Sequence, residues 1–164
     1  GEVAESADQL LRAVNEQPLT MPDGEKPLVL IIEDNHQASQ LIQMYLQEAG
    51  YRTETAKDGA DGLEKAKQLK PQIITLDMIM PVKDGWQVLK ELKRHPICKD
   101  IPIIIITAYG TVESATEAIQ KGGFDFITKP FRKEQILFTI DKALKWLNVQ
   151  RENKMLKERL KKQE

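Results

Sequence analysis

The sequence predicts an α/β fold in which five parallel strands form a doubly wound sheet with helices on both faces. Short apolar segments alternate along the chain with amphipathic segments of helical length, and the connections are short and rich in Gly, Pro and Asp. The segments 28–32 and 102–106 are apolar throughout instead of alternating. Strands of this kind belong to parallel sheets that are covered on both faces.

Each expected element has its own signals. The β-branched strand 28–32 precedes a helix over 37–49 that Gly50 ends. Residues 52–56 alternate like a strand nearer the sheet edge, and the helix 59–69 stops before Pro71. The remaining expected elements are strand 72–76, helix 85–94, strand 102–106, helix 111–121, strand 124–127 and a long helix from residue 133. Five such units with right-handed crossovers give the flavodoxin-like arrangement.

Composition limits the classes of function. The chain has 164 residues, 41% hydrophobic and 30% charged, which suits one domain with appendages. A formal net charge of −1 gives no basic field, so we expect no direct nucleic-acid partner within this chain. No segment approaches the ~20 apolar residues of a membrane span, and the first residues do not resemble a signal peptide. We therefore expect a cytoplasmic protein without a membrane partner, and we interpret the single Cys98 as an incidental thiol.

Three regions are predicted along the chain. Residues 1–27 read as a leader and linker with a weak helix, residues 28–147 as the main domain, and residues 148–164 as a helical extension. Apolar residues in the extension follow a spacing of three and four, with an Asn at one a position; they are Trp146, Val149, Asn153, Leu156 and Leu160. This pattern predicts a parallel coiled-coil homodimer. A solvated charged tail is the alternative.

Chemically useful side chains follow four of the five strands. Glu33-Asp34 ends the first, Asp77 the third, Thr107-Ala108 the fourth and Thr128-Lys129-Pro130 the fifth. The carboxyl ends of parallel strands lie at one edge of the sheet, so these groups can share a pocket. Three close carboxylates repel one another unless a cation lies between them, and their hard oxygens suit Mg²⁺.

The same groups fit phosphoryl transfer. Lys129 supplies a point charge for a phosphoryl group, Thr107 supplies a hydroxyl, and backbone N–H groups of the following loop can complete the cradle. Asp77 can act as a nucleophile and form an acyl phosphate. Phosphoryl transfer requires mainly positioning and charge neutralisation, and this set of residues provides both.

Residues 28–147 resemble the receiver domain of two-component response regulators, whose fold is CheY-like. The matching segments are Leu-Ile-Ile-Glu33-Asp34-Asn, Leu-Asp77-Met-Ile-Met-Pro81, Asp84-Gly85, Thr107-Ala108 and Thr128-Lys129-Pro130-Phe. The resemblance implies that Asp77 is the phosphoacceptor of a bacterial-type phosphorelay. It also implies a cis peptide between Lys129 and Pro130.

The resemblance assigns further roles. Glu33, Asp34 and Asp77 would hold Mg²⁺ with the backbone carbonyl of Ile79, and Glu33, which stands where Asp is commoner, is expected to contact the ion through water. Thr107, Lys129 and the backbone of Ala108 would contact the phosphoryl oxygens. The implied partner is a sensor histidine kinase or its receiver-bearing domains.

Two positions in the resemblance depart from the commoner pattern. Phe126 occupies the switch-aromatic position, where Tyr is commoner, and would move inward with Thr107 without a hydroxyl to bond. Ile79 and Tyr109 stand where side chains are thought to tune dephosphorylation, and we expect their bulk to give a long-lived phosphoryl state.

The resemblance leaves the parent protein open. Residues 111–132 and the tail Gln150-Arg151-Glu152-Asn153 resemble activators in which a receiver precedes an ATPase domain, whereas residues 84–102 look more like receivers of hybrid sensor kinases.

Other functions fit the sequence less well. A phosphorylation-independent dimerisation scaffold would not need the Asp77, Thr107 and Lys129 pocket. A phosphatase with an Asp nucleophile would usually carry a second Asp two residues on, where this chain has Ile79. No Gly-rich loop follows the first strand, which argues against a nucleotide-binding enzyme. We therefore predict a phosphorylation-controlled switch and not an enzyme in its own right.

Overall fold

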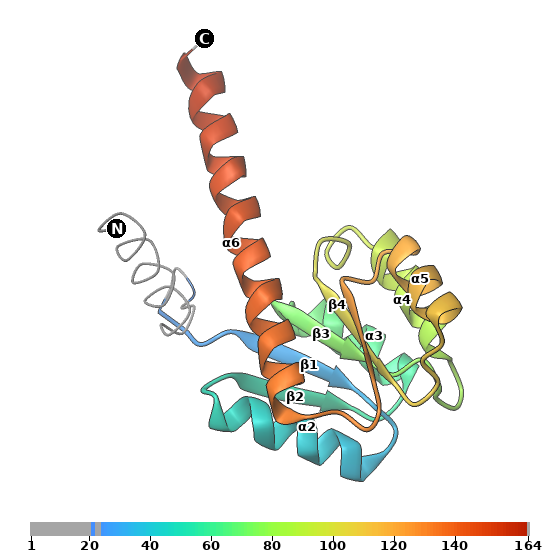
Figure 1. The fold of residues 1–164 in the computed structure, drawn as a ribbon. Helices are drawn as coiled ribbons and strands as arrows, with labels where there is room; N and C mark the ends of the chain where they lie inside the picture. Colours follow the sequence, from blue (N-terminus) through green and yellow to red (C-terminus); the bar gives the residue numbers. More distant parts are fainter. Residues whose placement is uncertain (1–20, 22–23, 164) are drawn as a thin grey trace, which may run out of the picture.

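One parallel sheet of five strands organises the protein in the order β2-β1-β3-β4-β5 (Figure 1). The computed structural model describes residue 21 and residues 24–163. The strands are β1 (Leu28–Ile32), β2 (Arg52–Ala56), β3 (Ile73–Leu76), β4 (Ile103–Thr107) and β5 (Asp125–Thr128). The predicted fold is thereby confirmed, and β3 lies at the centre of the sheet.

Five described helices cover the two faces of the sheet (Figure 1). They are α2 (His36–Glu48), α3 (Gly59–Leu69), α4 (Gly85–Arg94), α5 (Val112–Gln120) and α6 (Lys133–Gln163). Leu30 and Ile32 of β1 pack in a cluster with α3, α4 and α5, while Val29 and Ile31 pack in a second cluster with α2 and α6. Successive side chains of a strand point to opposite faces, so β1 contributes to both clusters.

Polar caps fix where four helices begin. The side chains of Asn35, Asp58, Asp84 and Thr111 accept hydrogen bonds from backbone N–H groups in the first turns of α2, α3, α4 and α5. Each satisfies a donor that would otherwise lack an intrahelical partner. Asn35 follows β1 closely, so its cap keeps that loop at the carboxyl edge of the sheet short, whereas the longer connection over 77–84 separates β3 from α4.

Gly85 lets α4 begin directly against the segment after β3. A Cβ atom at this position would lie 2.3 Å from the Cα atom of Met78 and 2.5 Å from the carbonyl oxygen of Asp77. These contacts are shorter than any side chain tolerates without a backbone shift, so this site requires glycine. The same contact fixes the position of the loop that carries Asp77.

Three details of packing do not follow from the apolar pattern of the sequence. In α3, the apolar residues Ala60 and Leu69 are exposed, whereas Gly62 lies against Ile32. In α5, the apolar residues Val112 and Ile119 are exposed and only Ala118 is buried. Cys98 lies in a polar sequence, yet its side chain is fully buried in the cluster under α4.

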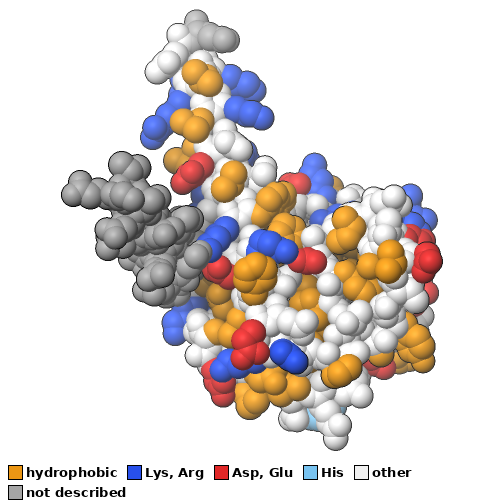
Figure 2. Space-filling model, in the orientation of Figure 1, with side chains coloured by type: hydrophobic (Ala, Val, Ile, Leu, Met, Phe, Trp, Pro, Cys, Tyr) orange, Lys and Arg blue, Asp and Glu red, His pale blue; other side chains and the backbone are white. Residues whose placement is uncertain are grey.

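The last helix docks on the sheet and then continues beyond it (Figure 1). Ile136, Ile140, Ala143 and Leu144 are buried where the helix packs on the sheet. Further along α6, apolar side chains on the coiled-coil positions are exposed; they are Trp146, Val149, Leu156 and Leu160. Figure 2 shows hydrophobic side chains among charged ones on the projecting part of this helix. Among the described helices none is long and apolar enough to cross a membrane. The helix expected in the leader falls outside the described residues.

Candidate functional site

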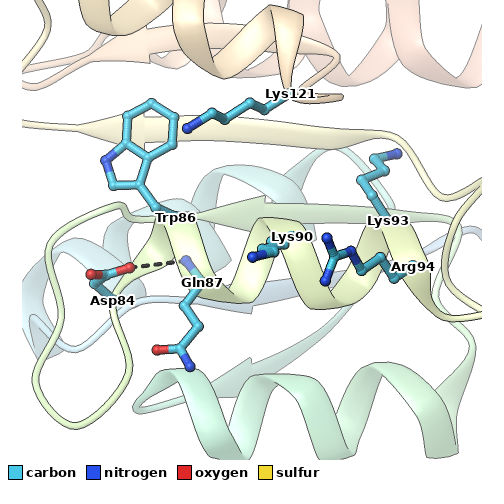
Figure 3. A pocket seen from close by; sticks show the side chains of 7 residues that line it. All are labelled: Asp84, Trp86, Gln87, Lys90, Lys93, Arg94 and Lys121. Carbon is cyan, nitrogen blue, oxygen red and sulfur yellow. Dashed lines mark hydrogen bonds between the residues drawn. The ribbon is translucent and has the colours of Figure 1, made fainter.

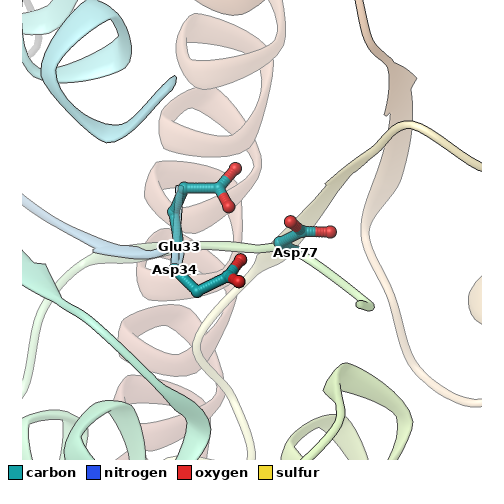
Figure 4. A group of neighbouring side chains, drawn as sticks. All are labelled: Glu33, Asp34 and Asp77. Atoms are coloured by element: carbon teal, nitrogen blue, oxygen red, sulfur yellow. The ribbon is translucent and has the colours of Figure 1, made fainter. Parts of the chain in front are cut away.

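Three carboxylates meet at the carboxyl edge of the sheet (Figure 4). The N–H of Asp77 donates to the carbonyl of Ile32 at 3.0 Å, which joins the end of β3 to the end of β1. Glu33 and Asp34 follow directly, and one oxygen of each of the three side chains lies within 4.8 Å of the others. Glu33 and Asp77 are buried, whereas Asp34 is exposed. The predicted acidic cluster therefore forms.

Lys129 joins this cluster from the end of β5. Its Nζ donates a hydrogen bond to Oδ2 of Asp77 at 3.1 Å and a second one to Oε1 of Glu33. Its backbone N–H donates to the carbonyl of Thr107 at 2.9 Å, which fixes it beside β4. The peptide between Lys129 and Pro130 is cis, as the resemblance implied.

Charge in this pocket is unbalanced, with three carboxylates against one ammonium group. Burial raises the pKa of Glu33 to about 7, and its contact with Asp77 adds to the effect while Lys129 opposes it. Burial alone would lower the pKa of Lys129, but its hydrogen bonds and charge interactions with Glu33 and Asp77 outweigh burial and raise it. The pocket therefore favours one more cation.

The donor set fits a hard divalent cation. Glu33, Asp34 and Asp77 offer only oxygen ligands, and no His or Cys belongs to the group. Three carboxylates beside the single ammonium group of Lys129 leave an excess of negative charge, which a bound cation would neutralise. The acidic triad could therefore hold a metal ion.

Thr107 ends β4 with a polar atom that lacks a partner. Its side chain is buried, and Oγ1 forms no hydrogen bond among the described residues. Leaving a buried hydroxyl unpaired costs about 1–3 kcal/mol, so such an atom suggests a ligand that bonds to it. The following residue, Ala108, is exposed and leaves its position open to solvent.

The other predicted residues lie around the acidic cluster. The N–H of Ile79 donates to Oδ1 of Asp77 at 3.1 Å, and the Ile79 side chain is half-exposed. Tyr109 is more exposed. Phe126 is half-buried, and its ring would lie 3.1 Å from a Cβ atom at Gly110.

The packing roles of two glycines near the site were not predicted. Gly85 is required by the backbone of Asp77 and Met78, and a Cβ atom at Gly110 would lie 1.9 Å from Cγ2 of Thr128. The Asp84-Gly85 pair was interpreted as turn chemistry and as one of the segments that match the receiver pattern, without this packing role. The close approach of separate loops, which makes both glycines necessary, leaves no separate signal in the sequence.

Comparison with known proteins agrees with this geometry. Residues 29–141 match the family described as the response regulator receiver domain. The chain is 36% identical over 119 residues to the DNA-binding dual master transcriptional regulator RpaA of a Synechocystis species, which covers 73% of this chain and 49% of RpaA.

Solved structures give the same result. The chemotaxis protein CheY4 of Vibrio cholerae superposes with a TM-score of 0.69 at 31% identity, covering 73% of this chain and 99% of CheY4. NtrX of Brucella abortus superposes with a TM-score of 0.76 at 28% identity, covering 82% of this chain and 31% of NtrX. This chain spans about half the length, or less, of the curated relatives it matches.

Proposed function

Because this chain belongs to the response regulator receiver domain family, we propose that Asp77 is its phosphoacceptor. Membership places the chain in two-component signalling, where a histidine kinase is the partner. The observation that carries the assignment is the bond between Asp77 Oδ2 and Lys129 Nζ, inside a cluster that also holds Glu33 and Asp34. A cytoplasmic location belongs to the proposal, since response regulators generally act there.

The reaction is a nucleophilic displacement at phosphorus. A carboxylate oxygen of Asp77 attacks the phosphoryl group of a kinase phosphohistidine, so a P–O bond forms while the P–N bond breaks. The electron pair of the P–N bond stays on the imidazole nitrogen. Lys129 already contacts the acceptor carboxylate and is well placed to neutralise a phosphoryl oxygen.

The metal in this proposal is Mg²⁺, held by Glu33, Asp34 and Asp77 with the carbonyl of Ile79. When bound, it would neutralise charge on the transferred phosphoryl group. Lys129 alone cannot balance three carboxylates together with an incoming phosphoryl group.

Phosphorylation then biases a two-state equilibrium. The unpaired Oγ1 of Thr107 gains a partner in the phosphoryl group, with the backbone of Ala108 as a second donor. Movement of Thr107 makes room for Phe126, whose ring is half-buried on the neighbouring strand β5. The surface formed by α5 and β5 changes as a result.

The output is a homodimer through α6, in a chain where a leader and linker over 1–27 precede a receiver domain over 28–147 and a helical extension over 148–164. Support comes from the exposed apolar side chains Val149, Leu156 and Leu160 at coiled-coil spacing. Asn153 is exposed in the same row and would fix a parallel register.

The first test is the intact mass of the protein after incubation with acetyl phosphate and Mg²⁺. We expect one phosphoryl adduct that requires Mg²⁺ and is missing in the Asp77→Asn variant. A well-folded protein without an adduct would favour the alternative function, a phosphorylation-independent scaffold.

The second test is sedimentation of the unphosphorylated and phosphorylated protein. Leu156→Lys should weaken the dimer, whereas Met155→Lys, a matched control one residue away and off the coiled-coil spacing, should not. Equal effects of the two substitutions would rule out the proposed coiled coil.

A further inference from the structure

A positively charged groove lies between α4 and the end of α5 (Figure 3). Its volume is about 700 Å³, within the range of small-molecule sites, and its lining includes Trp86, Lys90, Lys93, Arg94 and Lys121. None of the acidic-pocket residues lines it. The groove is therefore separate from the acidic pocket.

The cations of this groove outnumber its anions. Four cationic side chains line it, and Asp84 is the single carboxylate among the lining residues. Oδ1 of Asp84 is already used as the cap of α4, where it accepts from the N–H of Gln87 at 2.9 Å. Just outside the lining, Glu117 pairs with Lys121 at 2.7 Å. The four cationic side chains still outnumber the carboxylates when Glu117 is counted with Asp84, so the groove has an excess of positive charge.

Two of these cations are free to bind a ligand. Lys90 and Arg94 are exposed and form no ion pair within residues 24–163. Lys93 differs, since its Nζ donates to the carbonyls of Lys99 and Ile101 and contributes only charge. Lys90 and Arg94 are four residues apart on α4, so both can reach the same anionic group. The planar fork of an arginine is suited to phosphate oxygens.

An aromatic side chain lies at the other end of the groove. Trp86 precedes Arg94 by eight residues on α4, about 12 Å along the helix axis. Its indole is partly buried against the core, and Nζ of Lys121 lies 5.2 Å from the ring centroid. A partly exposed indole can contact a planar heterocycle while the cations bind phosphates. The groove thus suits a ligand with one aromatic and one polyanionic end.

We propose that this groove binds a nucleotide with two or more phosphates, its phosphates on Lys90 and Arg94 and its base against Trp86. An acidic protein segment would spread its carboxylates over a longer span than the two free cations, which lie within about one helical turn. The compact charge therefore favours phosphates.

The test is calorimetric titration of the full chain with ADP and GDP in metal-free buffer. We expect saturable 1:1 binding by at least one of them that weakens as salt is added. The double variant Lys90→Gln with Arg94→Gln should bind at least tenfold more weakly. Its matched control is Lys157→Gln with Arg159→Gln, which removes the same charges from the exposed end of α6 and should bind like the wild type.

Two further variants distinguish binding in this groove from binding at the acidic pocket and from charge attraction alone. Asp77→Asn should leave nucleotide binding unchanged, because the acidic pocket is not involved. Trp86→Leu, checked for folding by circular dichroism, should weaken nucleotide binding but leave the affinity for inorganic tripolyphosphate unchanged.

Three results would overturn the proposal. They are the absence of saturable binding of ADP or GDP, equal weakening by the α6 control, and tripolyphosphate or a hexaglutamate peptide binding as tightly as the nucleotides.

Discussion

Glu33 should make the stability of the metal-free protein depend on pH in an unusual direction. Its side chain is buried, and its pKa is raised from 4.5 to about 7. The folded protein therefore binds this proton more tightly than the unfolded chain does. Consequently, the contribution of Glu33 to stability is full below pH 4.5 and is lost as the pH rises to about 7.

The size of the effect follows from the pKa displacement. At about 1.4 kcal/mol for each tenfold change in an ionisation constant, moving the pKa of Glu33 from 4.5 to about 7 corresponds to about 3 kcal/mol. Glu33→Gln removes this titration and keeps the size and one acceptor oxygen of the side chain. As the pH rises from 4.5 to 8, the free energy of unfolding of the variant should therefore rise by about 3 kcal/mol relative to that of the wild type.

The assay is urea denaturation of both proteins at several pH values, in EDTA and then in Mg²⁺. The difference between the two curves reports the titration of Glu33 together with its interaction with Asp77 and Lys129. Mg²⁺ should stabilise the wild type more at pH 8 than at pH 5, since the ion binds the ionised carboxylate. Parallel pH curves for the two proteins in EDTA would refute the reasoning.

Three further substitutions test the pocket. Thr107→Val removes the unpaired hydroxyl and should raise the free energy of unfolding by about 1 kcal/mol. The same substitution should abolish any phosphorylation-dependent change in sedimentation. A loss of stability would show that Oγ1 has a partner. Gly85→Ala should lower the free energy of unfolding by about 3 kcal/mol or more, because its Cβ would lie 2.3 Å from the Cα atom of Met78; an unchanged denaturation midpoint would contradict this packing. Ile79→Asn should shorten the lifetime of phosphorylated Asp77 by about tenfold, or about 1.4 kcal/mol in barrier height, because a polar group replaces a bulky apolar one beside the acceptor. The decay of the adduct is followed by mass spectrometry. A wild-type half-life of seconds would rule out the expected long-lived state.

Several features of the site were open to prediction because they depend on chain order alone. Glu33, Asp77 and Lys129 each follow a strand directly, and parallel strands bring such positions to one edge whatever the packing of the helices. The register of the sheet then pairs Ile32 with Leu76 and Thr107 with Thr128. Identifying the strands in the sequence was therefore enough to predict that the carboxylates lie near the lysine.

Contacts between separate helices and loops could not be predicted in this way. The exposure of Ala60, the burial of Cys98 and the need for glycine at position 110 all depend on which neighbour lies within a few ångströms. Hydrophobic periodicity gives the face of a helix only to within a residue or two. The α4–α5 groove was missed for the same reason, since Trp86 and Lys121 are far apart in the sequence.

The sequence by itself determined the order of strands and helices, the parallel sheet and the group of residues at its carboxyl edge. Alternation of apolar segments and short loops permits few other topologies, and residue type directly specifies hard oxygen ligands and a cation. Only the tertiary structure decided that Thr107 has an unpaired hydroxyl, that the pKa of Glu33 is raised and that free cations line a groove. Burial, hydrogen-bond partners and local charge arise from distances between groups remote in the chain, and these distances exist only after the chain has folded.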